Sequence, residues 1–166
     1  MKLRHLQTLF TESTWIVPTR TLRAYLTIGN TPPEEVIDQT VWILDKFEKG
    51  YVFGTSYTMI DGTPLSKTRI VGSITPDGNV LFSFHTNTTI TSGQGAFQIR
   101  SKCHSDRKSC RFLMQMNTLN SLDQGVLGIS HWSYMVPTNP LEYEYHNLPG
   151  VGLSVPEFIA MFDTTN

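Results

Sequence analysis

Residues 51–62 read YVFGTSYTMIDG, and this stretch decides the fold class. Successive side chains of an extended strand point to opposite faces, so the odd-numbered residues from Tyr51 to Met59 share one face and the even-numbered residues share the other. The Asp61-Gly62 pair that follows is typical of a tight turn, because glycine adopts a positive φ without steric cost. The stretch therefore predicts a β-strand that ends in a hairpin turn.

The same period of two continues along the chain in both directions. Residues 67–74 alternate in this way, and the PDGN sequence at residues 76–79 predicts the next hairpin turn. Further strands are predicted over residues 21–28, 36–47, 80–85, 88–100, 111–118 and 124–135. The Glu34-Glu35 pair before residues 36–47 leaves a helix as a competing prediction for that run.

Short turns between successive strands determine how the strands pair. They join antiparallel neighbours, whereas parallel neighbours need crossover helices. Such a meander must pair or cover its edge strands, and closure into a barrel achieves this. The sequence therefore predicts an all-β, up-and-down antiparallel meander of about eight strands that closes into a barrel, forming a single domain over residues 1–166.

Short helices are predicted at both ends of this meander. Leucines at positions 3, 6 and 9, with Phe10, recur at helical spacing. Near the other end, Ser154 precedes Pro156 and Glu157, which is the pattern of an N-cap followed by a helix that extends to about Phe162.

Composition excludes some classes of partner. The 13 basic residues are balanced by 14 acidic ones, giving a net charge of −1, and charged residues make up only 16% of the chain. No cationic excess is available to neutralise phosphates, so the chain is not expected to bind nucleic acid through charge. No apolar run approaches the roughly 18 residues of a membrane-spanning helix. Threonine is abundant, at about one residue in eight.

The N-terminus and the two cysteines bear on the cellular compartment. No apolar core follows the basic residues near Met1, so no signal peptide is visible, and a cytoplasmic location is expected rather than secretion. Cys103 and Cys110 flank a six-residue stretch, which is compatible both with a disulfide between two adjacent strands and with two free thiols.

Aromatic and methionine side chains dominate the predicted strands and form the candidate lining of the barrel. A barrel of eight strands is just wide enough either to be filled by side chains or to hold one small ligand. These residues could accordingly be simple core, but together they suit a flat apolar ligand. The candidate ligand-binding residues are Tyr51, Phe53, Tyr57, Phe82, Phe84, Phe97, Phe112, Met114, Trp132 and Tyr134, and Met116 belongs to the same candidate lining.

Among the histidines, His131 is the candidate general acid or base. It lies on the strand face opposite Trp132 and Tyr134, and only one of these two faces can line the interior. His85 lies opposite Phe82 and is expected to point towards solvent if that aromatic face is internal. No metal-ligand spacing and no dinucleotide fingerprint are present, so no cofactor is predicted.

The order of elements resembles the calycin group, which contains lipocalin-type and avidin-type barrels. The sequences FGTSY at residues 53–57, VLFSF at 80–84 and TSGQGAF at 91–97 are similar in order to avidin-like strands, and the resemblance spans residues 36–135. The Gly-x-Trp signature of lipocalins is missing near the first strand. The resemblance implies a barrel fold, and such barrels include both ligand carriers and small cyclases.

These observations lead to three functional hypotheses. The first is a protein that binds a small, largely apolar or aromatic molecule inside the barrel, with Tyr57, Trp132 or Tyr134 orienting the ligand. The second is an isomerase or cyclase that acts on an apolar substrate without a metal or nucleotide cofactor, with His131 or a tyrosine as acid or base. The third is a protein–protein interaction module with a filled barrel, which would use an outer surface such as residues 141–155.

Overall fold

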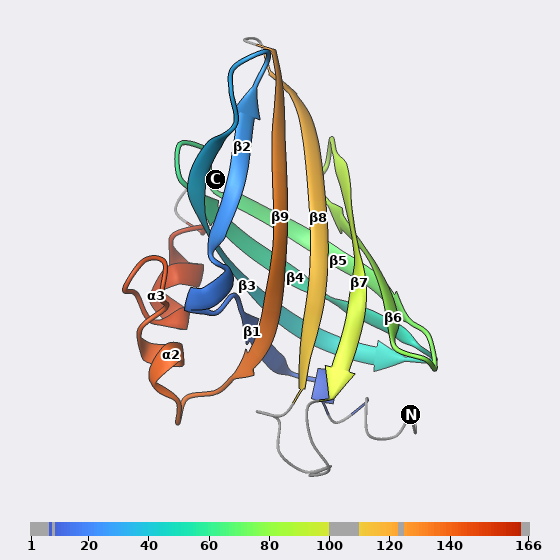
Figure 1. The fold of residues 1–166 in the computed structure, drawn as a ribbon. Helices are drawn as coiled ribbons and strands as arrows, with labels where there is room; N and C mark the ends of the chain where they lie inside the picture. The colour runs from blue at the N-terminus through green and yellow to red at the C-terminus, as the bar shows by residue number, and fades with distance from the viewer. Residues whose placement is uncertain (1–6, 8, 100–109, 123–124, 164–166) are drawn as a thin grey trace.

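The chain forms a closed antiparallel β-barrel, shown in Figure 1. The computed structural model describes residues 7, 9–99, 110–122 and 125–163. Within these residues the strands are β1 (Ser13–Ile16), β2 (Arg23–Ile28), β3 (Glu34–Glu48), β4 (Tyr51–Ile60), β5 (Ser66–Ile74), β6 (Asn79–His85), β7 (Ile90–Ile99), β8 (Cys110–Leu122) and β9 (Gly125–Thr138).

The strand order explains how nine described strands make an eight-stranded barrel. Strands β3 to β9 are neighbours in sequence order, and all of their pairings are antiparallel. Both β1 and β2 pair with β3 on one side and with β9 on the other, so these two short strands share the eighth position end to end. The predicted all-β meander that closes into a barrel is confirmed.

The junction between β1 and β2 interrupts the backbone ladder. On β3, the register places β2 against residues 34–37 and β1 against residues 41–44, and on β9 it places them against residues 127–130 and 136–138. The intervening residues 17–22 include the 3₁₀ helix η1 (Thr19–Thr21). We call this junction the seam; it comprises residues 17–22, 38–40 and 131–135.

Several strand boundaries differ from the sequence-based predictions. The segment after the Glu34-Glu35 pair is entirely strand, so the competing helix prediction for residues 36–47 is wrong. Pairing on both sides, with β4 and with β1 and β2, holds these residues in the extended conformation. Strand β1 was not predicted, because four residues are too few to show a period.

Two short helices, α2 (Tyr143–His146) and α3 (Val155–Ala160), cover part of the outer face (Figure 1). The predicted cap is present: the Ser154 side chain accepts the backbone N–H of Glu157, and the Glu157 carboxylate accepts the backbone N–H of Ser154. Apolar residues of this segment, including Phe158 and Phe162, pack against Val41 of β3 and Tyr57 of β4. None of the helices in the described residues is long and apolar enough to cross a membrane.

The N-terminal helix is predicted from residues that lie mostly outside the described ones. Gln7, Leu9 and Phe10 are helical, whereas Leu3 and Leu6 are not described. Phe10 is completely buried and packs at one end of the barrel interior.

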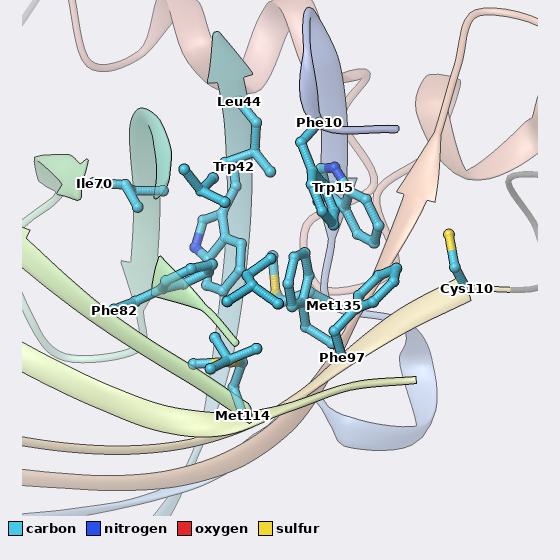
Figure 2. Packing of buried hydrophobic residues seen from close by; sticks show 14 of the residues in the cluster. Phe10, Trp15, Trp42, Leu44, Ile70, Phe82, Phe97, Cys110, Met114 and Met135 are labelled. Atoms are coloured by element: carbon cyan, nitrogen blue, oxygen red, sulfur yellow. The ribbon is translucent and has the colours of Figure 1, made fainter. Parts of the chain in front are cut away.

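Aromatic side chains fill this end of the interior, which we call the filled end (Figure 2). Phe112 is fully buried at its centre, and its ring centroid lies 4.8 Å from that of Trp15 and 5.8 Å from that of Trp42. Gly72 of β5 makes room for Phe82, because a Cβ atom at this position would lie 1.8 Å from the Phe82 ring. Cys110 is also buried here, whereas Cys103, its partner in the predicted alternatives of a disulfide or two free thiols, lies outside the described residues.

Candidate functional site

The opposite end of the barrel contains a cavity of about 450 Å³. Its apolar base is formed by Trp42, Phe84, Met114 and Met135, which separate it from the filled end. The upper walls and the mouth carry many hydroxyl groups, contributed by Thr40, Ser56, Thr58, Thr63, Ser66, Thr68, Thr86, Thr88, Thr89, Thr91 and Ser133. The cavity therefore joins an apolar base to a hydroxyl-rich mouth.

Some predicted lining residues do face the interior. Phe84, Met114 and Met116 line the cavity. Phe82, Phe97 and Phe112 are buried, but they belong to the cluster at the filled end. These three rings do not line the cavity, because they pack against one another and against the residues that close the barrel.

The prediction that Tyr51, Phe53, Tyr57, Trp132 and Tyr134 line the interior is wrong. On β4 the buried positions are Val52, Gly54 and Ser56, and the aromatic residues between them alternate to the outer face. On β9 the side chain of Trp132 is 58% exposed, and Tyr134 lies beside it with the Arg111 guanidinium 3.8 Å from its ring centroid.

Two packing constraints reverse the expected orientation of β4. At Gly54 the backbone of the paired strand β3 leaves no room for a side chain, since a Cβ atom there would lie 2.2 Å from the backbone oxygen of Ile43. The outer face is covered by the C-terminal segment, where the Tyr57 ring packs edge-on against Phe162 at 5.3 Å. Large aromatic side chains are thus accommodated outside this strand rather than inside it.

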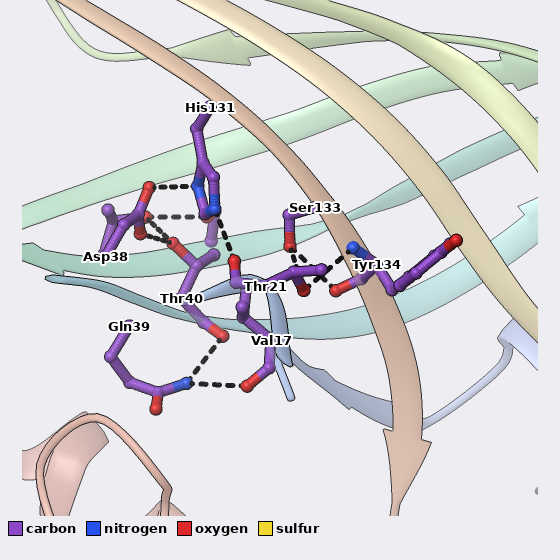
Figure 3. A network of polar contacts seen from close by, with 10 residues as sticks. Val17, Thr21, Asp38, Gln39, Thr40, His131, Ser133 and Tyr134 are labelled. Atoms are coloured by element: carbon purple, nitrogen blue, oxygen red, sulfur yellow. Dashed lines mark hydrogen bonds and ion pairs between the residues drawn. The ribbon is translucent and has the colours of Figure 1, made fainter. Parts of the chain in front are cut away.

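His131 lies inside the barrel at the seam, where it pairs with Asp38 (Figure 3). Its Nδ1 atom lies 2.7 Å from Oδ2 of Asp38, and its Nε2 atom lies 2.6 Å from the backbone oxygen of Thr21. Both side chains of the ion pair are more than nine-tenths buried. The pair joins β9 to β3 across the interruption in the backbone ladder, and the Thr21 contact ties η1 to β9.

Both ring nitrogens of His131 are engaged: Nδ1 shares a proton with Oδ2 of Asp38, and Nε2 donates to the backbone oxygen of Thr21. Burial lowers the pKa of His131, but hydrogen bonding and charge attraction from Asp38, with the Thr21 carbonyl, outweigh it and raise the pKa above 6.5. His131 lines the cavity, so its face of β9 is the internal one of the two considered in the sequence analysis. In this arrangement, however, neither ring nitrogen is available to accept a proton from a substrate.

A chain of hydroxyl groups extends from this ion pair along the cavity wall. The Thr40 hydroxyl donates to Oδ1 of Asp38 at 2.8 Å, and its oxygen lies 3.0 Å from the Thr58 hydroxyl. The Ser56 hydroxyl in turn lies 3.3 Å from that of Thr58. We call these four residues, together with His131, the polar wall; all five line the cavity.

Sequence reasoning did not identify Asp38 or the three hydroxyl residues of the polar wall. One signal was present: Asp38 and Thr40 share a strand face with Trp42 inside an otherwise β-branched and aromatic run. A carboxylate inside a buried strand needs a partner, and that requirement points to a site. The abundance of threonine was a second signal, because eight threonines line the cavity.

Comparison with protein-family models, with curated proteins and with solved structures gave no match for this chain. Its site must therefore be interpreted from its own geometry. Among the described residues there is no cluster of three or more histidine, cysteine or carboxylate side chains that could hold a metal ion.

The ion pair predicts a pH dependence of stability. The native state holds the His131 proton more tightly than the unfolded chain, whose pKa is near 6.5, so the stabilisation is complete below pH 6.5 and is lost as pH rises through the higher native pKa. One such proton gives a slope of at most about 1.4 kcal/mol per pH unit. Urea unfolding between pH 6 and 9 measures this slope, and we expect Asp38→Asn to flatten it. An equal slope in the variant would contradict the assignment.

Proposed function

We propose that this protein is a calycin-like barrel that binds a small molecule in the cavity, with the apolar body of the ligand against the base. The observation that carries the proposal is the cavity of about 450 Å³ itself. Its volume falls within the roughly 300–1,000 Å³ that is typical of small-molecule sites. The exposed Thr88 lies at its mouth, which gives a ligand a route from solvent.

The lining defines the class of ligand. Indole, phenyl and thioether groups at the base offer apolar, polarisable surface that suits an aromatic or aliphatic ring system. The hydroxyl groups above them offer hydrogen bonds, so a ligand with one polar substituent fits better than a pure hydrocarbon. The Asp38–His131 pair has no net charge and therefore offers no attraction for a charged ligand. A neutral ligand is therefore favoured.

The two alternative functions receive less support. The isomerase or cyclase hypothesis needs an acid or base facing the substrate, and the hydrogen bonds of His131 occupy both of its nitrogens. The hypothesis of an interaction module rests on a filled barrel, and the cavity counts against it. Ligand binding requires only the cavity and its lining, without a free acid or base, and is therefore the function we favour.

Two variants of one strand test the proposal. Thr91 lines the cavity from β7, whereas its neighbour Ser92 is exposed on the outer face. We expect 2-methoxynaphthalene, a neutral bicyclic probe, to bind with a micromolar to millimolar Kd in titration calorimetry. Thr91→Trp narrows the cavity and should weaken binding by about tenfold or more, because the indole displaces the probe.

The matched variant Ser92→Trp adds the same indole outside the barrel and should leave the affinity within about twofold of the wild type. Circular dichroism and thermal melts verify that both variants are folded. Equal losses in the two variants, or no binding of any neutral bicyclic probe to the wild type, would overturn the proposal.

A further inference from the structure

The polar wall has a fixed direction of proton donation, which can be deduced from its hydrogen bonds. Each hydroxyl group has one proton to donate and two lone pairs to accept. Thr40 donates its proton to Asp38, so the contact between Thr40 and Thr58 requires Thr58 to donate. The proton of Thr58 is then engaged, so in its contact with Ser56 the serine must donate.

This direction does not depend on where the proton of the ion pair resides. The shared proton can be assigned to Nδ1 of His131 or to Oδ2 of Asp38, and in both cases Oδ1 of Asp38 accepts from Thr40. The second N–H of His131 is engaged by the Thr21 carbonyl. Every proton of the polar wall is therefore already donated within the protein.

What the polar wall presents to the cavity is consequently a set of acceptors. Among the described residues, none donates a hydrogen bond to the Ser56 oxygen, and the oxygens of Thr40 and Thr58 each accept one, which leaves lone pairs available on all three. A ligand hydroxyl or N–H can donate to these oxygens. A carbonyl, ether or carboxylate placed against the same wall meets lone pairs without a donor, which is unfavourable in a buried site.

We infer that the cavity selects ligands that carry a hydroxyl or N–H donor over ligands of the same shape that carry only acceptors. The inference rests on the proposed function, since it specifies which ligand the cavity takes. The ligand class it names is an apolar ring system or chain with one neutral donor, such as an alcohol, a phenol or an indole. The donor lies against the polar wall and the apolar body lies against the base.

Three probes of one shape test this selectivity. 2-Naphthol carries a donor, 2-methoxynaphthalene lacks it, and 2-naphthoate is an anion that offers acceptors alone. Titration calorimetry at pH 6.5 should give an affinity for 2-naphthol about tenfold higher than for 2-methoxynaphthalene, although the ether is the more apolar molecule. 2-Naphthoate should bind most weakly.

A variant of the hydroxyl chain tests the mechanism. Thr58→Val keeps the shape of the side chain but removes the acceptor of the Ser56 proton, which becomes available to a ligand. The preference for 2-naphthol should then fall to within about threefold. Thr55→Val changes a neighbouring threonine on the outer face of β4 and should keep the full preference.

The possible results separate the two proposals. Equal affinities for 2-naphthol and 2-methoxynaphthalene in the wild type would overturn the inference and leave the proposed function in place, and this comparison needs no variant. An unchanged preference in folded Thr58→Val would also overturn it. Binding of none of the three probes would overturn the proposed function and the inference with it.

Discussion

His131→Ala is expected to lower the free energy of unfolding by about 3–5 kcal/mol, because it leaves a buried carboxylate without its cation. Within the described part of the chain, the Asp38 carboxylate would retain only the hydrogen bond from Thr40, in a position where its side chain is 8% exposed. Native proteins are stable by only about 5–15 kcal/mol, so the loss would be a large share of the total. Chemical denaturation followed by tryptophan fluorescence measures it.

Two controls distinguish the effect of breaking the ion pair from the effect of removing a histidine side chain. His85→Ala removes a half-buried histidine that points away from the aromatic interior, and it should change stability by less than about 0.5 kcal/mol. The double variant His131→Ala/Asp38→Ala removes both charges, so its loss should be clearly smaller than the sum of the two single losses. Additive losses would show that the two side chains do not interact.

Phe112→Ala is expected to have an effect of similar size, about 3–5 kcal/mol, through cavity formation at the filled end. The Phe112 side chain has no exposed surface, and its ring lies within 5.8 Å, centroid to centroid, of the aromatic rings of Phe10, Trp15, Trp42, Phe82 and Phe97. These rings come from the N-terminal helix and from strands on several sides of the barrel, so they cannot collapse together into the vacated space. Urea unfolding of the folded variant measures the loss.

The neighbouring residue supplies the comparison. Leu113→Ala removes an aliphatic side chain from the outer face of the same strand, where it is only half-buried, and should lower stability by about 1 kcal/mol or less. A loss at Leu113 as large as that at Phe112 would mean that the filled end is not the main source of packing energy in β8.

Local patterns allowed much of the fold to be predicted from sequence. The turn at residues 76–79 depends on Gly78, whose φ of +92° is accessible to glycine because it has no Cβ atom. The cap of α3 depends on Ser154 and Glu157, which lie three residues apart. Turns and helix caps depend on residues that lie close together in the chain, so the sequence contains all the information needed to predict them.

The orientation of the strands was harder to predict, because alternation defines two faces without saying which one is internal. The aromatic residues of β4 were expected inside, yet Tyr57 packs outside beneath Phe162, more than a hundred residues later in the sequence. On β6 the same reasoning succeeded, since Phe82 and Phe84 are internal. The two strands differ in what covers their outer faces, and that covering is a tertiary property.

The candidate site illustrates the same limit. His131 was identified as a possible functional residue, but its partner Asp38 lies 93 positions away and becomes its neighbour only through the barrel register. The hydroxyl chain also depends on register, since Thr40 faces Thr58 because β3 and β4 pair directly at these residues. A sequence identifies single residues with reactive side chains, but it does not show which of them are brought into contact by the fold.

The seam also constrains when the protein can complete its fold during synthesis. Strand β1 pairs with β9, with Thr14 opposite Thr138, so the barrel can close only after β9 has been synthesised. Without β9 the barrel cannot close, because β8 would lack its partner on one side and β1 and β2 would pair only with β3. Unpaired strand edges of this kind favour association with other chains. Asp38 on β3 and His131 on β9 meet only when the barrel closes in the correct register. A closure in the wrong register would bury either charge alone, so the pair makes misassembled barrels unstable and favours the native one.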